Sequence, residues 1–596
     1  MKPRKKEENK IGNYTSWHNI FKAYLIKDIL LCSILVSVCA AVTFLNIGAT
    51  DFPQTSYSSS EPIFIDFGRM VNFNGVLFLN GGNRHAEGFK IYSWDGDDET
   101  DLIREVNLYS RSGEDIELIH EEMQVNWYYW LPFRFEVATR YVIIEPDTTG
   151  IEILEMAFFD NYGYVGPVVY YPSEAALIFD EPELIPEAPS NMLVMSFDES
   201  LFALTAYEFI HAKRPYEVTH PPLGKSIIAL GINIFGMTPF GWRFMSALFG
   251  VIMIIPIYVL SKRMFGSWIL AFLVAFTFTF DFMRFAQTRV ANIDTFLVMF
   301  IICTYLFMYE YTRISPENRL TLKSLIYLGF SGAFMGLAIS IKWSGVFAGL
   351  GLGVLFTLAW VKSRAHYASS KMKGLFLKDF NKTVIYCLLF FIVVPVVIYC
   401  LSYIPFVRVS DLSWFESIIS SQVDMLSFHT NFAGSNDYQS RWWTWPLNLR
   451  SVLYSRFHLP DGKIMGIHSF GNPALWWGGL LTLAWCVKYW IAEKDKIAQF
   501  LCIAWIAQIL PWAFVSRFSF IYHYFPCVPF LALMIAYFIK NREPRHQKWY
   551  VAGYCILVLI LFVMFYPVLN GVIAANKDYV RLLEWLPGWH FIGMDY

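Results

Sequence analysis

The sequence predicts a polytopic α-helical membrane protein with a β-rich domain inserted near its N-terminus. The 596-residue chain is 56% hydrophobic, only 16% of it is charged, and its mean hydropathy is +0.40, which excludes a soluble multi-domain protein. Apolar runs of about 20 residues, long enough to cross a bilayer as helices, recur along the chain. Short alternating runs typical of β-strands occupy one stretch between the first two apolar runs.

Eleven apolar runs are predicted to be membrane helices. The first follows the basic N-terminus MKPRKKEENK, and its length and the later runs favour an uncleaved span over a signal peptide. The predicted spans are 29–47, 241–261, 267–283, 291–311, 322–341, 343–361, 383–404, 473–490, 497–514, 520–539 and 549–570.

The loops between these spans alternate in charge, which predicts an orientation. Basic residues gather at Lys262 and Arg263, in 362–382 and in 540–548. The positive-inside rule places these loops and the N-terminus in the cytoplasm. An odd number of spans then places the C-terminus and residues 51–240 outside the cytoplasm. The net charge of −2 says nothing about partners, and no nucleic-acid partner is expected.

Residues 51–160 are predicted to form an extracytoplasmic β-sandwich, because short β-type runs there are separated by Gly, Asn and Asp clusters. The segment ATRYVIIEPDTTGIEILEMAFFD resembles the last strands of discoidin-like, galactose-binding jelly rolls. A glycan ligand and a purely structural role both stay open. Residues 161–195 are rich in Pro and Glu and are predicted to be a linker. The nine cysteines all lie in or beside apolar runs, outside 51–200, and are interpreted as small apolar core residues.

Charged and aromatic residues are predicted to gather at the outer ends of the spans. They are Asp198, Glu199, His220, Arg289, Asp294, Lys342, His429, Trp442, Trp443, Trp445, Arg517, Tyr522 and His523. Each has an ordinary explanation: cations snorkel to headgroups, tryptophans form an interfacial belt, and an acidic pair suits a helix N-terminus. Their joint placement on one membrane face favours a functional site. A transporter would instead carry polar residues near the midplane.

The segment 196–240 connects the insert to the second span. THPPLGKSIIALGINIFG indicates an extended residue before proline and then a Pro-led helix. That helix is too short for a span and is predicted to lie in the interface. With the acidic pair, it would form the floor of an outward-facing cavity.

Several sequence blocks occur in a characteristic order: FDES, HPPLGKSII, FGWR, FDFMRFAQTRVANID, GLAISIKWSG, SRWWTWP and FIYHYFP. Over about residues 190–540 the chain resembles the protein O-mannosyltransferase family, whose members use a polyprenyl-phosphate mannose donor. The resemblance implies a GT-C fold with the catalytic acidic pair in the first outer loop. The chain departs from the family in its inserted β-sandwich and in a loop 405–472 that is too short for the lumenal repeat domain of eukaryotic members.

The chemistry that the resemblance implies is a single inverting displacement. The phosphate leaving group needs no proton donor, so one carboxylate takes the proton of the acceptor hydroxyl and cations stabilise the departing phosphate. Asp198 is expected to be the base, and Glu199 to hold the geometry of the pair or the acceptor. Arg289, Lys342 and His523 are expected to bind the donor phosphate, with Asp294 orienting Arg289 or the sugar. His220, His429, Arg517, Tyr522, Trp442, Trp443 and Trp445 are expected to support the site.

The sequence thus predicts a membrane glycosyltransferase that moves mannose from polyprenyl-phosphate mannose to Ser or Thr hydroxyls of exported or membrane proteins. No metal is expected to be required. The alternatives are transfer of another sugar to a glycolipid or wall polymer and, in a different class, a sugar transporter or sensor. The predicted division is 1–50 (cytoplasmic N-terminus and first span), 51–160 (β-sandwich), 161–195 (linker), 196–240 (catalytic segment) and 241–596 (ten further spans).

Overall fold

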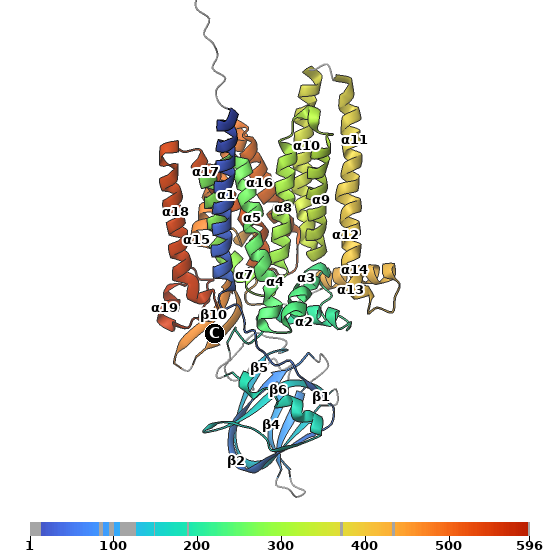
Figure 1. The fold of residues 1–596 in the computed structure, drawn as a ribbon, viewed down its shortest axis with the longest axis vertical. Helices are drawn as coiled ribbons and strands as arrows, with labels where there is room; N and C mark the ends of the chain where they lie inside the picture. Colours follow the sequence, from blue (N-terminus) through green and yellow to red (C-terminus); the bar gives the residue numbers. More distant parts are fainter. Residues whose placement is uncertain are drawn as a thin grey trace, which may run out of the picture.

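The computed structural model describes residues 14–593, apart from 83–87, 95–99, 108–126, 148–149, 187–189, 370–372, 432–435 and 460. It consists of a long helical bundle with a β domain at one end (Figure 1). The basic stretch 1–13, which is predicted to be cytoplasmic, lies outside the described residues, as does the segment 108–126 of the predicted β-sandwich.

The bundle is built from long apolar helices that run roughly parallel to one another (Figure 1). Ser267 caps α6 and Asp495 caps α16 by accepting hydrogen bonds from the first backbone amides, and Gly266 ends α5 in the left-handed conformation. The bundle helices are α1 (Tyr14–Phe44), α4 (Pro239–Ile252), α5 (Ile254–Phe265), α6 (Trp268–Thr279), α7 (Phe282–Thr288), α8 (Asp294–Thr312), α9 (Leu322–Ile341), α10 (Val346–Ser369), α11 (Phe376–Leu388), α12 (Val394–Ser402), α15 (Pro473–Glu493), α16 (Lys496–Ile509), α17 (Val528–Lys540) and α18 (Pro544–Phe565).

Within the described residues, nine helices are long and apolar enough to cross a membrane. The pair α6–α7, bent by 59° at its break, makes a tenth. Helix α15 occupies the position of the remaining predicted span and packs against α17 and α18, but it is rich in tryptophan and ends in charged residues. The polytopic fold is confirmed, and the count of eleven stays a prediction.

The β domain (residues 57–171) is one antiparallel sheet with the strand order β1-β6-β2-β5-β3-β4. Strand β2 changes neighbours along its length: Phe64 lies opposite Tyr171 of β8, whereas Val76 lies opposite Phe158 of β6. Register shifts between these points bend the sheet over a single apolar core. The strands are β1 (Tyr57–Ser59), β2 (Ile63–Asn80), β3 (Gly88–Trp94), β4 (Thr100–Asn107), β5 (Trp130–Pro146), β6 (Ile151–Asp160), β7 (Gly163–Val165) and β8 (Val169–Tyr171).

The linker predicted for 161–195 is wrong in its first half. Strand β7 pairs with β6 and β8 pairs with β2, so both belong to the sheet. The following 3₁₀ helix η1 (Ser173–Ile178) buries Ala175 and Ile178 in the same core. Proline and glutamate in this stretch mark short edge strands and turns rather than a free chain.

Two short helices and a β-hairpin connect the bundle to the β domain. Helices α2 (Glu199–Ile210) and α3 (Leu223–Phe235) pack together at the β-domain end of the bundle (Figure 1). The hairpin of β9 (Val452–His458) and β10 (Lys463–Ser469) contributes Phe457 and Met465 to the β-domain core. The β domain is therefore docked on the membrane part through apolar contacts.

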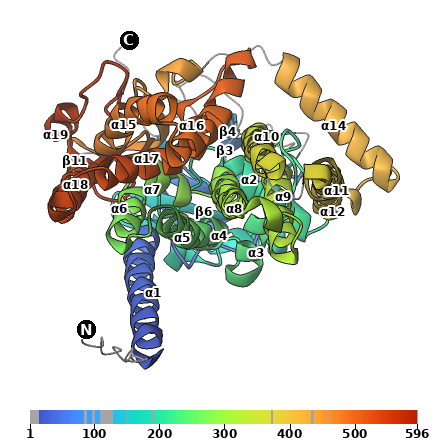
Figure 2. The same ribbon diagram turned by 90° about the horizontal axis from the view of Figure 1, so that it is seen from above.

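The loop 405–472 also contains α14 (Trp414–Asn431), which extends away from the bundle on the side opposite α1 (Figure 2). Phe415, Ile419 and Val423, spaced four residues apart, are all more than half exposed along it. An apolar stripe on an exposed helix at this level is typical of a helix lying in the membrane interface.

Candidate active site

The two neighbouring carboxylates of the acidic pair point to different surroundings. Glu199 is 1% exposed and forms two hydrogen bonds with the Arg243 guanidinium, from Nε to Oε1 at 2.7 Å and from Nη2 to Oε2 at 2.6 Å. It also accepts hydrogen bonds from the backbone amides of Ser196 (2.7 Å) and Ala291 (2.8 Å). Glu199 was grouped with the catalytic pair and expected to hold the geometry of the pair or the acceptor. Each of its oxygens already accepts two hydrogen bonds, which hold the start of α2 against α4 and the turn before α8. These contacts fit the first of the two roles and leave neither oxygen for an acceptor.

Arg243 was missed in the sequence, although the FGWR block contains it. Its guanidinium also donates to the backbone oxygens of Ile47 (2.8 Å) and Val194 (2.7 Å). Arg243 is 2% exposed. Its hydrogen bonds therefore join the end of α1, the segment before α2, and α4 in one buried network.

Asp198 is the half-buried member of the pair. It stands at the N-cap of α2, but its side chain makes no capping hydrogen bond. Burial raises the pKa of Asp198 to about 7; the Lys342 ammonium opposes this shift, and the carboxylates of Asp294 and Glu217 add to it. A carboxyl group that titrates near neutral pH can accept and release a proton under working conditions.

The backbone before Asp198 is strained. Phe197 has φ = +54°, a left-handed conformation that a bulky residue rarely adopts and that costs about 1–3 kcal/mol. Its ring stacks on Tyr454 at 4.5 Å and meets the Tyr522 ring edge-on at 5.9 Å. These contacts stabilise the turn that sets the direction of Asp198.

Lys342 and Asp294 form a buried ion pair beside Asp198. Lys342 ends α9, Asp294 begins α8, and Nζ lies 2.9 and 3.1 Å from the two carboxylate oxygens. Lys342 Nζ also lies 5.5 Å from the centre of the Tyr522 ring. Asp294 was predicted to orient Arg289 or the sugar; its observed partner is Lys342.

Arg289 was predicted to bind the donor phosphate, and this prediction is corrected. Its guanidinium donates to the backbone oxygens of Thr43 (2.8 Å), Leu45 (2.7 Å) and Asn46 (2.8 Å). Arg289 is 4% exposed and closes the C-terminal end of α1, whose last carbonyls have no helical partner. These bonds occupy both terminal nitrogens, and Nε, which has no partner among the described residues, is buried.

His220 belongs to a second charged group, which the sequence pattern did not reveal. Its Nδ1 lies 3.0 Å from Glu217 Oε1, and Lys225 forms a buried ion pair with the other oxygen of Glu217. Burial raises the pKa of Glu217, but Lys225 and His220 together lower it well below its usual range. The group fixes the His-Pro-Pro turn at the start of α3. His429 of α14 joins it through Nε2, which lies 2.9 Å from the backbone oxygen of Thr219.

A row of aromatic side chains leads from the surroundings of Asp198 to the loop after α16. Tyr522 contacts His523 at 4.6 Å, and His523 stacks on Trp512 at 4.3 Å. Trp445 is 1% exposed and packs against Trp512 at 5.4 Å. Trp445 is therefore part of the packing around His523. A phosphate-binding role for His523 stays a prediction.

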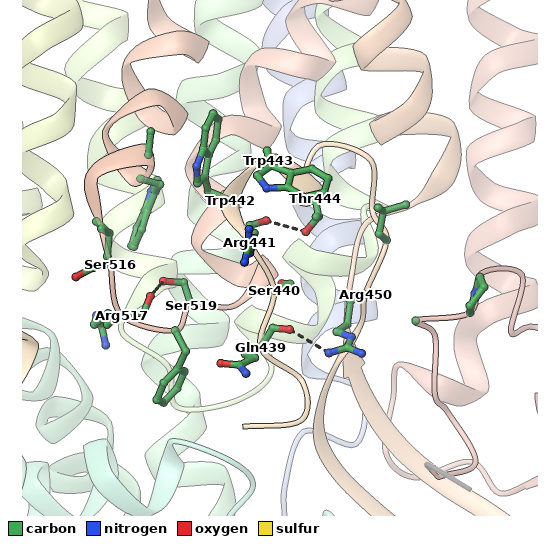
Figure 3. A pocket seen from close by; sticks show the side chains of 17 residues that line it. Gln439, Ser440, Arg441, Trp442, Trp443, Thr444, Arg450, Ser516, Arg517 and Ser519 are labelled. Atoms are coloured by element: carbon green, nitrogen blue, oxygen red, sulfur yellow. Dashed lines mark hydrogen bonds between the residues drawn. The ribbon is translucent and has the colours of Figure 1, made fainter. Parts of the chain in front are cut away.

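A cavity of about 1190 Å³ opens at the far end of this row (Figure 3). Trp512, Trp442 and Trp443 line it, together with Arg441, Arg450 and Arg517. None of the described residues that line it is acidic. The cavity is therefore cationic and aromatic, which suits an anionic group such as a phosphate.

Two family models match the chain. The model described as "Dolichyl-phosphate-mannose-protein mannosyltransferase" matches residues 190–407, and the "C-terminal four TMM region of protein-O-mannosyltransferase" matches 414–589. Both matches lie after the β domain. They include Asp198, Lys342 and the cationic cavity.

Several curated relatives carry the name polyprenol-phosphate-mannose–protein mannosyltransferase. The one from Mycolicibacterium smegmatis is 25% identical over 464 residues, covering 67% of this chain and 89% of the relative. The one from Corynebacterium glutamicum is 27% identical over 435 residues, covering 62% and 81%. The S. cerevisiae protein O-mannosyltransferase Pmt1–Pmt2 complex bound to the sugar donor shares the fold: its TM-score is 0.58 at 14% identity, covering 66% of this chain and 89% of the yeast chain.

Proposed function

Since this chain belongs to the protein O-mannosyltransferase family of membrane glycosyltransferases, we propose that it mannosylates Ser or Thr hydroxyls of exported or membrane proteins with Asp198 as the base. The donor is polyprenyl-phosphate mannose, as in the relatives' names. The observation that carries the proposal is the position of Asp198. It is a half-buried carboxylate without a capping bond, beside the Lys342–Asp294 pair and at the β-domain end of the bundle.

The reaction is one displacement at the anomeric carbon. The acceptor oxygen forms the new bond to this carbon while Asp198 takes the hydroxyl proton. The bond from the carbon to the phosphate oxygen breaks, and the phosphate keeps the electron pair. Because the two events occur on opposite faces, the anomeric configuration inverts.

The negative charge that builds on the leaving phosphate needs cations close to it. Lys342 supplies one on the side of Asp198. We assign the second to Arg517, in place of Arg289, because Arg517 lines the cationic cavity and its charge acts on His523, as the charge of Lys342 does. Trp442 and Trp443 line the same cavity and would contact the donor lipid near its headgroup. On this proposal, side chains do the work of a metal ion.

We further propose that the active site faces away from the cytoplasm. The β domain and α2, whose N-cap is Asp198, lie at one end of the bundle, while α1 begins at the other (Figure 1). Lys262 of α5 pairs with Asp28 of α1 at 2.7 Å near that opposite end, where basic residues gather. The positive-inside rule assigns the basic end to the cytoplasm.

A glycan ligand of the β domain stays a prediction.

Reconstituted transfer tests the proposal. The purified chain in nanodiscs is given polyprenyl-phosphate mannose and a Ser/Thr-rich peptide, and mass spectrometry locates the added hexose. A peptide with Ala in place of Ser and Thr is the acceptor control, and polyprenyl-phosphate glucose is the donor control. We expect transfer from the mannose donor to the Ser/Thr peptide, including in EDTA. Transfer from the glucose donor, or to lipid and not peptide, would overturn the proposal.

A further inference from the structure

Glu155 is a buried carboxylate that the transfer reaction does not use. It lies on β6, is 0% exposed, and its Oε1 has no hydrogen-bond partner in the described chain. Its other oxygen accepts one hydrogen bond, from the backbone amide of Glu181 at 3.2 Å. A buried charge left without a partner is costly, so this side chain calls for a proton or a cation.

Two more carboxylates converge on Glu155. Asp180 and Glu181 follow η1, and one oxygen from each of the three side chains lies within 4.8 Å of the others. Asp180 is exposed and Glu181 is half-buried, so the group is buried on the side of Glu155 and open to solvent on the other. None of the three forms an ion pair with a basic side chain of the described residues.

The group lies where the chain enters and leaves the β domain. Glu181 Oε2 accepts hydrogen bonds from the backbone amide of Gln54 and from the Thr55 hydroxyl, both at 3.0 Å. The Gln54 side chain in turn exchanges two hydrogen bonds of 3.2 Å with the backbone of Met237, between α3 and α4. The carboxylates thus join strand β6 to both connections of the domain and, through Gln54, to the membrane part.

We propose that Glu155, Asp180 and Glu181 bind a divalent cation of the Ca²⁺ type that fixes the β domain on the membrane part. Three carboxylates and no nitrogen or sulfur donor are a ligand set for a hard cation. The open side admits the water molecules that complete six to eight oxygen ligands. The shape favours Ca²⁺ over Mg²⁺, which demands near-ideal octahedral geometry. The site is distinct from Asp198, and the inference does not depend on the mannosyltransferase activity.

Metal binding by the full-length protein in nanodiscs, after chelation and removal of the chelator, tests the proposal. Tb³⁺ luminescence with Ca²⁺ competition reports binding, and thermal unfolding reports stabilisation. The variants are Glu155→Gln and Asp180→Asn. The matched control is Glu174→Gln, an exposed carboxylate on η1 whose only described contact is with its neighbour Ser173.

The wild type and Glu174→Gln are expected to bind Tb³⁺, release it to Ca²⁺ more readily than to Mg²⁺, and gain Tm with Ca²⁺. Asp180→Asn changes an exposed side chain and should keep the fold while losing at least tenfold in affinity. Glu155→Gln should lose binding altogether. If Ca²⁺ leaves the wild-type Tm unchanged, or if both variants bind Tb³⁺ as the wild type does, the proposal fails. In that case a proton shared among the carboxylates satisfies Glu155.

Discussion

Lys342 Nζ lies 2.9 Å from one carboxylate oxygen of Asp294 and 3.1 Å from the other, joining the end of α9 to the start of α8. The pair is nearly inaccessible, with Lys342 7% and Asp294 3% exposed. It therefore has two roles that experiments can separate: it stabilises the bundle, and it presents a positive charge beside Asp198.

Lys342→Gln should lower turnover by about 10²–10³-fold through lost stabilisation of the leaving phosphate. It should also lower Tm, because Asp294 is left as an uncompensated buried charge. The double variant Lys342→Gln/Asp294→Asn should recover Tm and stay inactive. Lys323→Gln, at the other end of the same helix, is the matched control. Recovery of turnover in the double variant would show that Lys342 is only structural.

Glu199→Gln should act on folding rather than on chemistry. The variant leaves Arg243 buried without its counter-ion, which typically costs about 3–5 kcal/mol. We expect a large drop in Tm and a specific activity, per folded molecule at low temperature, within about tenfold of the wild type. A Glu199→Gln protein that unfolds like the wild type but does not transfer mannose would restore the catalytic role predicted from the sequence.

Arg289 and Arg517 should respond in opposite ways to loss of charge. Arg289→Gln breaks the cap on α1 and should reduce Tm. Arg517→Gln removes a cation from the cavity wall and should lower kcat/KM for the donor by about tenfold to a hundredfold, the value of a charged hydrogen bond, at unchanged Tm. Donor-saturation curves and thermal unfolding of both variants check this, with exposed Arg545→Gln as the control. The reverse pattern would return the phosphate site to Arg289.

Sequence periodicity gave correct predictions where the determinant is local, because apolar runs located the bundle helices. The orientation predicted from charge stays a prediction, as do the roles of Asp198 and Lys342. The errors concern partners far apart in the chain. Glu199 and Arg243 are 44 positions apart, and no pattern in either segment reveals that they meet. Arg289 looked available for a ligand because the carbonyls that it binds belong to the end of α1 and the two residues after it, more than 240 positions away.

The β domain shows the same limit. Its strands were predicted from alternation, but β7 and β8 are three residues each, too short to give a periodic signal. The packing of Phe457 and Met465 into the β-domain core depends on how the domain docks on the membrane part, and residue composition does not predict docking. A linker was therefore predicted where the chain completes the sheet.

The pH dependence of transfer follows from Asp198. The base must be ionised to accept a proton, and its pKa is raised to about 7. We expect kcat/KM for the peptide to be constant above this pH and to fall about tenfold per unit below it. The raised pKa also means that ionised Asp198 destabilises the fold as pH rises through 7. Asp198→Asn should therefore have a Tm at pH 8 at least equal to that of the wild type. A pH–rate profile that is flat from pH 5 to 8 would contradict the assignment.

The most direct test of Asp198 as the base is the turnover of purified Asp198→Asn with polyprenyl-phosphate mannose and the Ser/Thr peptide at pH 8. The substitution keeps the shape of the side chain and removes only its ability to take a proton. We predict a loss of about 10²–10⁴-fold in kcat, with donor binding and Tm preserved. A folded Asp198→Asn enzyme that transfers mannose at close to the wild-type rate would contradict the account.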